Sequence, residues 1–314
     1  MSIKKFIEEL AEALEARKEG LRVVPTEMRK NNGIVQNGVS FYRKNENVAP
    51  IFWLNQFYER FKKGELLKEH ILERIIREYE SLPTPNIPDM EEWMSSPEFL
   101  SQISIHLVNG PRNQKMIEDR NLVYYEVENT DLVCLFYAKV FLEDDTLGEV
   151  AITERIMEEY LPKVKDAEEL YRLVTEQVQP EELRFESSLS VMERLFREKK
   201  IDVPSFPTVE DYMYILSNKQ MTFGAGSILA KVVKKVLLEK FPSGRITVLP
   251  SSVHELILLD SATCGDLKQL RDTVRQVNAS EVSSEDYLAD EVYQYDANTG
   301  KLAIAEYTEG EVEE

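Results

Sequence analysis

A short stretch in the last third of the chain holds residue types that can carry out covalent chemistry. Ser251 and Ser252 offer hydroxyls, His254 an imidazole and Glu255 a carboxylate, and these are the groups of nucleophilic catalysis. The stretch lacks the G-x-S-x-G spacing that holds an active serine on a sharp turn. If a strand runs over 253–259, alternation puts His254 on an apolar face and turns Glu255 the opposite way. The pattern therefore favours a structural histidine, bonded to a serine hydroxyl or a carbonyl, over a catalytic one.

Glycines ahead of an expected helix over 228–241 suggest a second kind of site. Gly224 and Gly226 lead through Ser227 into this helix, which carries Lys231. Glycines before a helix let backbone N–H groups face an anion, with support from the helix dipole. However, the segment has neither the phosphate-loop spacing nor the third glycine of G-x-G-x-x-G. A tight turn capped by Ser227, with the lysine on a solvated face, is the favoured alternative.

The two stretches belong to the same part of the chain and together define one functional hypothesis. In it, the protein is an enzyme or a small-ligand or anion-binding protein with a site formed by residues 223–227 and 251–255. The hypothesis predicts that His254 and Gly226 share one concave pocket lined by convergent polar groups.

No set of residues in the sequence has the spacing of metal ligands. The chain has three histidines and two cysteines, without H-E-x-x-H or a thiol pair, so we expect no metal and no cofactor. His70 falls in an expected helix, and His106 falls in an apolar stretch. Cys134 is expected in the core. Cys264 is expected in the first turn of a helix over 265–277, as an oxidisable surface thiol.

Charge and composition restrict the classes of function. The 314 residues include 57 acidic and 38 basic ones, for a net charge of −19, and 43% are apolar. The first 80 residues carry a slight positive excess, and the acidic excess lies beyond them. A strongly acidic protein repels nucleic acid and anionic lipid, so direct nucleic-acid binding, through short basic pairs in the first 80 residues, is the weakest alternative. With neither an apolar signal core nor a run of about 20 apolar residues, we expect a soluble cytoplasmic protein.

Proline-rich segments near residues 85 and 203 divide the chain, because proline favours extended connections between packed units. We expect an N-terminal α-β-β-α-α unit over 1–85 and an acidic middle α+β unit over 86–203. A C-terminal α+β unit follows over 204–306, and an acidic tail over 307–314. The fold class is α+β, with mixed short sheets and packed helices in two or three units.

Hydrophobic periodicity predicts the individual elements. In the middle unit we expect strands over 122–127, 132–142 and 148–152, and helices over 153–160, 166–178 and 187–199. In the C-terminal unit we expect strands over 212–216, 245–249, 253–259, 292–295 and 302–305, and a short helix after the Ser283–Asp286 capping spacing.

Several segments resemble a known family. They are Tyr214–Lys219, Phe223–Gly226, Leu249–Glu255, Val274–Asn278 and Glu285–Tyr293. This order is similar to a family of uncharacterised bacterial proteins, a domain of unknown function that is common in anaerobic gram-positive gut bacteria and their mobile elements. Residues 29–33 and 54–58 fit the same family, so the resemblance spans nearly the whole chain. It implies no activity, substrate or catalytic residue. A mobile-element setting adds weight to host-interaction or defence roles by association.

The sequence therefore leaves the function open and favours one class. We expect a non-enzymatic cytosolic binding or regulatory protein that acts through its acidic surface on a protein partner. A basic or nucleic-acid-binding protein would complement that surface, and such binding would depend on salt. The alternative is that the negative charge serves only to keep the protein soluble and binds no partner.

Overall fold

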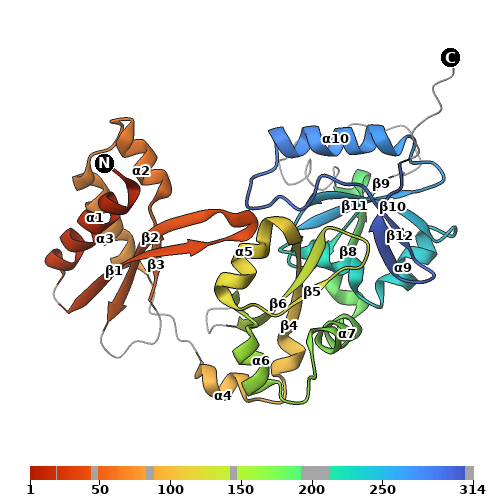
Figure 1. Cartoon of the computed structure of the whole chain (residues 1–314), viewed down its shortest axis with the longest axis horizontal. Helices are drawn as coiled ribbons and strands as arrows, with labels where there is room; N and C mark the ends of the chain where they lie inside the picture. The colour runs from red at the N-terminus through yellow and green to blue at the C-terminus, as the bar shows by residue number, and fades with distance from the viewer. Residues whose placement is uncertain (19, 44–48, 83–87, 142–146, 192–212, 308–314) are drawn as a thin grey trace. The chain divides into compact units, whose positions relative to one another are not determined.

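The chain forms two compact units, Met1–Asn86 and Ile87–Glu314. The computed structural model describes all residues except 19, 44–48, 83–87, 142–146, 192–212 and 308–314 (Figure 1). The sequence-based boundaries near 85 and 203, and the tail from 308 onward, lie outside the described residues. Each unit mixes helices with antiparallel strands, and this confirms the predicted α+β class.

Unit 1 packs three helices on a small antiparallel sheet. The sheet has the order β1 (Leu21–Arg29), β2 (Val35–Arg43), β3 (Ile51–Trp53). Helix α1 (Ile3–Arg17) is capped by Ser2 and buries an apolar stripe that includes Phe6, Leu10 and Leu14. This stripe forms one core with α3 (Lys68–Ser81) and with the facing side chains of β1 and β2, while α2 (Asn55–Lys62) packs at its edge. The helices and strands of unit 1 follow one another as α1, β1, β2, β3, α2 and α3, and the short strand β3 was not among the predicted elements.

Unit 2 is built on two antiparallel sheets. The larger has the strand order β13-β12-β10-β11-β9-β8, and in the smaller the long strand β6 pairs with β4, β5 and β7. The bounds of the smaller sheet are β4 Ile103–Asn109, β5 Tyr124–Glu126, β6 Leu132–Phe141 and β7 Leu147–Ala151. Those of the larger sheet are β8 Leu183–Ser187, β9 Met213–Asn218, β10 Arg245–Ser252, β11 Glu255–Asp260, β12 Tyr293–Asp296 and β13 Lys301–Ile304.

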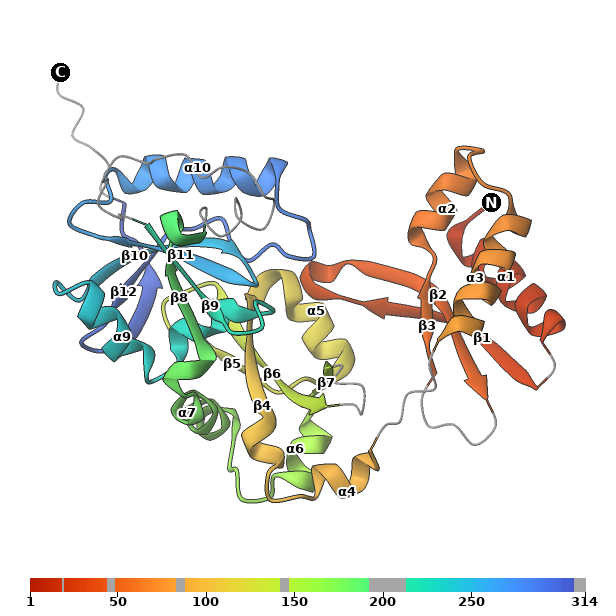
Figure 2. The same cartoon turned by 180° about the vertical axis from the view of Figure 1, so that it is seen from behind.

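Helices and 3₁₀ turns surround the two sheets of unit 2. Figures 1 and 2 show α10 lying along the larger sheet, and α5 and α6 beside the smaller one. Their bounds are α4 Met90–Met94, α5 Gly110–Arg120, α6 Glu154–Tyr160, α7 Ala167–Gln177, α9 Val233–Lys240 and α10 Leu267–Ser280. The 3₁₀ turns are η2 Phe99–Gln102, η3 Pro180–Glu182 and η4 Gly224–Leu229.

A single hydrophobic core fills the space between the two sheets. It joins Leu107 and Phe136 of the smaller sheet to Leu216, Val248 and Leu258 of the larger one. The parts that the sequence assigns to a middle and a C-terminal unit therefore share one core. Burial of a common core couples the folding of these parts, because each sheet covers the apolar face of the other.

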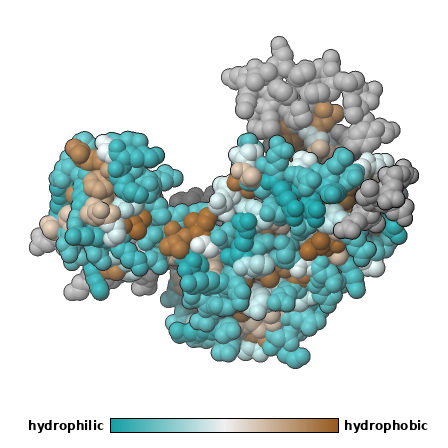
Figure 3. Space-filling view, turned by 45° about the horizontal axis from the view of Figure 1, so that its top comes forward, coloured by the Kyte–Doolittle hydropathy of each residue, from teal (hydrophilic) through white to brown (hydrophobic). Residues whose placement is uncertain are grey.

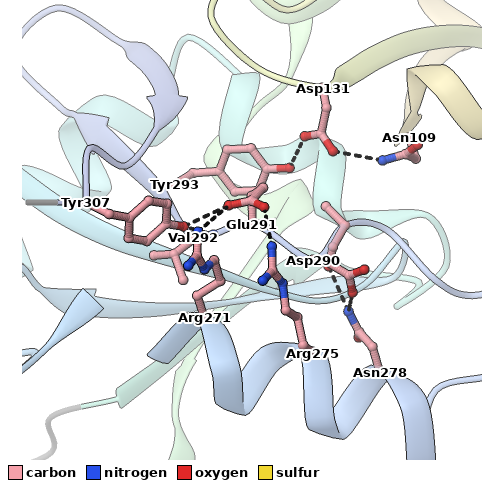
Figure 4. Close-up of polar contacts among 11 residues, drawn as sticks. Asn109, Asp131, Arg271, Arg275, Asn278, Asp290, Glu291, Val292, Tyr293 and Tyr307 are labelled. Carbon is pink, nitrogen blue, oxygen red and sulfur yellow. Dashed lines mark hydrogen bonds and ion pairs between the residues drawn. The ribbon is translucent and has the colours of Figure 1, made fainter. Parts of the chain in front are cut away.

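A cluster of polar side chains connects α10 to the segment that leads into β12 (Figure 4). The Glu291 carboxylate accepts a hydrogen bond from Arg275 at 2.8 Å and one from Tyr307 at 3.0 Å. Asn278, one turn further along α10, donates to Asp290 at 2.8 Å. Elsewhere in Figure 4, Tyr293 of β12 donates to Asp131, which also accepts from Asn109 at 2.9 Å. These contacts connect α10 to the segment before β12, and β12 to the smaller sheet.

Near the candidate segments, four elements differ from the sequence-based expectation. The helix expected over 228–241 is split, because the glycine segment forms η4 and α9 begins only at Val233. The strand expected over 253–259 begins at Glu255, after a turn. Asp266 is the N-cap of α10, so Cys264 precedes the helix instead of lying in its first turn. The residues after Ser283 form a turn without a helix.

Candidate functional site

His254 lies in the tight turn between β10 and β11. The register pairs Ser252 with Glu255, so Val253 and His254 are the two residues at the tip of the hairpin. This corrects the expectation that His254 is part of a strand and lies on its apolar face. Its Nε2 lies 3.1 Å from Oδ1 of Asp286, and its Nδ1 accepts a hydrogen bond from the backbone N–H of Phe223 at 3.1 Å. Both ring nitrogens are therefore occupied, and neither can take a proton from a nucleophile.

The polar neighbours of His254 bond to one another and to the backbone. Ser251 donates to the Glu255 carboxylate at 3.3 Å, and the Ser252 hydroxyl accepts from the backbone N–H of His254 at 3.1 Å. Ser217 donates to the carbonyl of His254 at 2.7 Å. No serine hydroxyl among the described residues bonds to the imidazole. The geometry favours the structural alternative for residues 251–255, with Asp286 as a partner 32 positions away.

The two candidate glycines are sites of close backbone approach. A Cβ on Gly224 would lie 2.1 Å from Oγ of Ser217 and 2.6 Å from the carbonyl oxygen of His254, and a Cβ on Gly226 would lie 2.9 Å from the carbonyl oxygen of Ile105. The N–H of Ala225 already donates to the carbonyl of Val253. The glycines thus let η4 pack against both sheets, which explains them without an anion cradle.

Phe223 places the glycine segment over a buried histidine on the smaller sheet. Its ring stacks on His106 of β4, with ring centroids 3.8 Å apart and planes 7° apart, and the other face of His106 stacks on Tyr137 at 4.1 Å. Phe223 has a positive φ of 49°. A positive φ raises the conformational energy of a bulky residue. The stacking of the Phe223 ring on His106 offsets this energy. His106 also bonds through Nε2 to Glu149 of β7 at 3.2 Å.

Burial lowers the pKa of His106, against the opposing effect of its bond to Glu149. The unfolded chain, with an ordinary histidine pKa near 6.5, then binds a proton below that pH that the folded chain does not. Stability therefore falls as the pH drops through about 6.5. We therefore expect His106 to lower the unfolding free energy as the pH falls from 7.5 to 5.5.

Urea unfolding of the wild type and of His106→Gln at both pH values measures this contribution together with that of its partner Glu149, because titrating groups that do not contact His106 cancel in the comparison. The glutamine variant should lose correspondingly less stability on acidification. An identical loss in both proteins would show that His106 does not titrate differently on folding.

Beside this stack lies a cavity of about 250 Å³. Its walls come from the start of β4, from β6, from the end of α7, from the edge strand β8 and its neighbour β9, and from η4. Gly226, Ser227 and Phe223 are part of the lining, whereas His254 and residues 251–255 are not. Gly226 and His254 therefore belong to one region without sharing this cavity. Lys231 also lies outside it, on the surface, where its ammonium pairs with Glu176 at 3.2 Å.

Three hydrogen-bond donors of the cavity wall are free. The Lys139 ammonium, the Ser227 hydroxyl and the Gln220 amide make no hydrogen bond or ion pair within the part of the chain that the structure describes. Glu149 lies opposite Lys139 on β7 and bonds to His106, so its carboxylate attracts the Lys139 ammonium through space without forming an ion pair with it. The other charged group of the wall, Glu182, accepts from the backbone N–H of Gln179 at 2.7 Å. The cavity thus presents an unpaired cation and two neutral donors.

Sequence reasoning found Gly226 and Ser227 but missed Lys139. A signal for it exists, because Lys139 is the only charged residue in the ten-residue strand β6, which is otherwise apolar or aromatic. Lysine is rarely buried without a partner for its charge, so a single lysine in an otherwise apolar strand indicates a possible functional role. His106 stands out within the apolar strand β4 in the same way.

Among the residues that the structure describes, no three His, Cys, Asp or Glu side chains are grouped in a way that could hold a metal ion. None of the described helices has the length and apolar character needed to cross a bilayer. Figure 3 shows a largely hydrophilic surface in its view, with hydrophobic residues in separate small areas.

Fold and site together define an α+β protein whose second unit carries a small polar cavity. Residues 3–297 match the model of a family described as "Family of unknown function (DUF5688)", and the chain belongs to that family. No curated protein and no solved structure matches the chain. The predicted membership in a family of uncharacterised proteins is thereby confirmed, while the bacterial, gut and mobile-element setting stays a prediction.

Proposed function

We propose that this protein binds a small anionic molecule in the cavity beside η4 and does not transform it. The unpaired Lys139 ammonium in the cavity wall is the observation that carries the proposal. A partly buried ammonium is costly unless it meets an anion. A carboxylate or phosphate group would pair with it, and the free Ser227 and Gln220 side chains would donate to the same ligand.

The size and shape of the cavity narrow the ligand class. A volume of about 250 Å³ equals the space of about eight water molecules at ~30 Å³ each, which suits a metabolite and is too small for a folded partner. Ile105, Val174 and Phe223 add apolar wall. This mixture of apolar surface and a few convergent polar groups is typical of small-molecule sites.

We propose binding without a chemical reaction because of how the two histidines near the cavity are bonded. His254 has both ring nitrogens bonded, and His106 is buried between two aromatic rings. Neither presents a free imidazole to the cavity, so catalysis that uses a histidine as general base lacks that group here. We also propose, as the sequence predicts, that the protein is cytoplasmic and that its acidic surface acts on a protein partner.

A thermal-shift screen of the full chain against a panel of carboxylate- and phosphate-bearing metabolites tests the proposal. At least one compound should raise the unfolding midpoint of the wild type, because ligand binding stabilises the folded state. The variant Ser227→Leu, which fills the cavity from η4, should lose that response. Ser251→Ala and His254→Gln should keep it, since neither residue lines the cavity.

Two outcomes would contradict the proposal. The first is a panel in which no anion stabilises the wild type. The second is a response that survives Ser227→Leu but is lost in His254→Gln, which would move the site to residues 251–255.

A further inference from the structure

A second concave surface of unit 2 lies between β5 and α6, and shares no lining residue with the cavity. It is an open groove of about 670 Å³. Tyr124, which is 43% exposed, and Met157 and Pro162 give it a solvent-facing apolar surface, which lies over the buried side chains of Leu122, Leu161 and Val164. The groove is thus an apolar surface open to solvent in the described residues.

The rim of the groove is negatively charged. Glu154 and Glu158 both line it from α6, one helical turn apart, and spacing of four residues places them on one face. Neither carboxylate makes an ion pair within the described ranges. The one cation that lines the groove, Lys165, pairs with Asp166 at 3.4 Å. Glu159 of the same helix, by contrast, pairs with Arg155 at 3.3 Å and does not line the groove.

We propose that this groove binds a cationic, amphipathic segment of a partner protein. Apolar side chains of the segment would cover the apolar surface of the groove, and its lysines or arginines would pair with Glu154 and Glu158. An apolar surface inside a rim of unpaired charge is the arrangement that gives an interface both affinity and specificity. A second copy of this chain fits less well, because a net charge of −19 makes two copies repel each other.

A binding measurement with a defined probe tests this assignment. The probe is a fluorescein-labelled 14-residue peptide of leucine and lysine, and the matched control peptide has glutamate in place of lysine. Fluorescence anisotropy is measured with the full chain as wild type, as Glu154→Gln/Glu158→Gln, and as Glu159→Gln/Glu181→Gln. The two double variants change the net charge equally, and all four positions are exposed, so folding should be preserved.

We expect the lysine peptide to bind the wild type, and binding to weaken as salt rises. The rim variant should bind it about tenfold more weakly, and the control variant within about twofold of the wild type. Equal losses in both variants would reduce the effect to net charge and overturn the proposal. So would equal binding of the glutamate peptide, no binding at low salt, or wild-type self-association that the rim variant abolishes.

Discussion

Valine in place of Gly224 should destabilise unit 2 by about 3 kcal/mol or more. The first carbon of any side chain at this position would lie 2.1 Å from Oγ of Ser217, 2.5 Å from the backbone nitrogen of Asn218 and 2.6 Å from the carbonyl oxygen of His254. Two of these atoms are backbone and cannot turn aside. Relief therefore requires η4 to move away from β9, which would also break the Phe223–His106 stack.

Urea unfolding followed by far-UV circular dichroism measures this effect. Gly148→Ala in β7 is the matched control, because its Cβ would find only ordinary contacts, the nearest at 3.7 Å from the carbonyl oxygen of Val140. The control should unfold close to the wild-type midpoint. A Gly224→Val protein as stable as Gly148→Ala would show that η4 does not pack against β9 in this way.

Methionine in place of Lys139 should weaken binding of the anionic ligand about 10- to 100-fold. A hydrogen bond between an ammonium and an anion is worth roughly 1.5–3 kcal/mol, and Lys139 is the only cation among the described residues that line the cavity. Methionine keeps the length of the aliphatic stem, so the strand β6 and the cavity walls should be preserved.

Titration calorimetry with the strongest compound of the panel measures the loss. The control is Lys235→Met, which removes the same charge from an exposed position on α9, outside the cavity. Its affinity should match that of the wild type. Equal weakening by both variants would mean that the charge of the protein as a whole, and not contact with Lys139, governs the binding.

Local periodicity was enough to predict most of the elements that form this fold. The long strand β6 is expected from its run of apolar and aromatic residues, and α7 and α10 from their apolar stripes. The hairpin from β12 to β13 is expected from the turn residues between them. In each case, the signal lies within a dozen residues, which is the range over which helix and strand patterns act.

Features set by contacts between distant segments were not predictable in the same way. The glycine segment looked like a loop before a helix, but close packing on Ser217 and Ile105 shapes it into η4. Strand β4 and helix α5 were absent from the predicted elements, although His106 was placed in an apolar stretch. Pairing of β4 with β6 is a long-range contact, and no local pattern indicates which strands meet.

The residues of the candidate site also come from distant parts of the sequence, so their proximity was not predictable from local patterns. Phe223 and His106 lie 117 positions apart in the sequence, and Lys139 comes from a second strand, β6. Asp286 was noted only as part of a capping pattern, whereas in the structure it bonds to His254. The sequence shows which residue types are present. Which of them come together in space depends on how the two sheets of unit 2 pack on one hydrophobic core.

A crystal structure of the full chain grown with the strongest-binding carboxylate or phosphate tests the central claim most directly. The account predicts difference density in the cavity beside η4, with an anionic oxygen within about 3 Å of the Lys139 nitrogen. It also predicts that Lys139→Met crystals grown with the same concentration of this compound show it at lower occupancy. Density at the His254 turn or on the lysines of α9, with none beside Lys139, would contradict it.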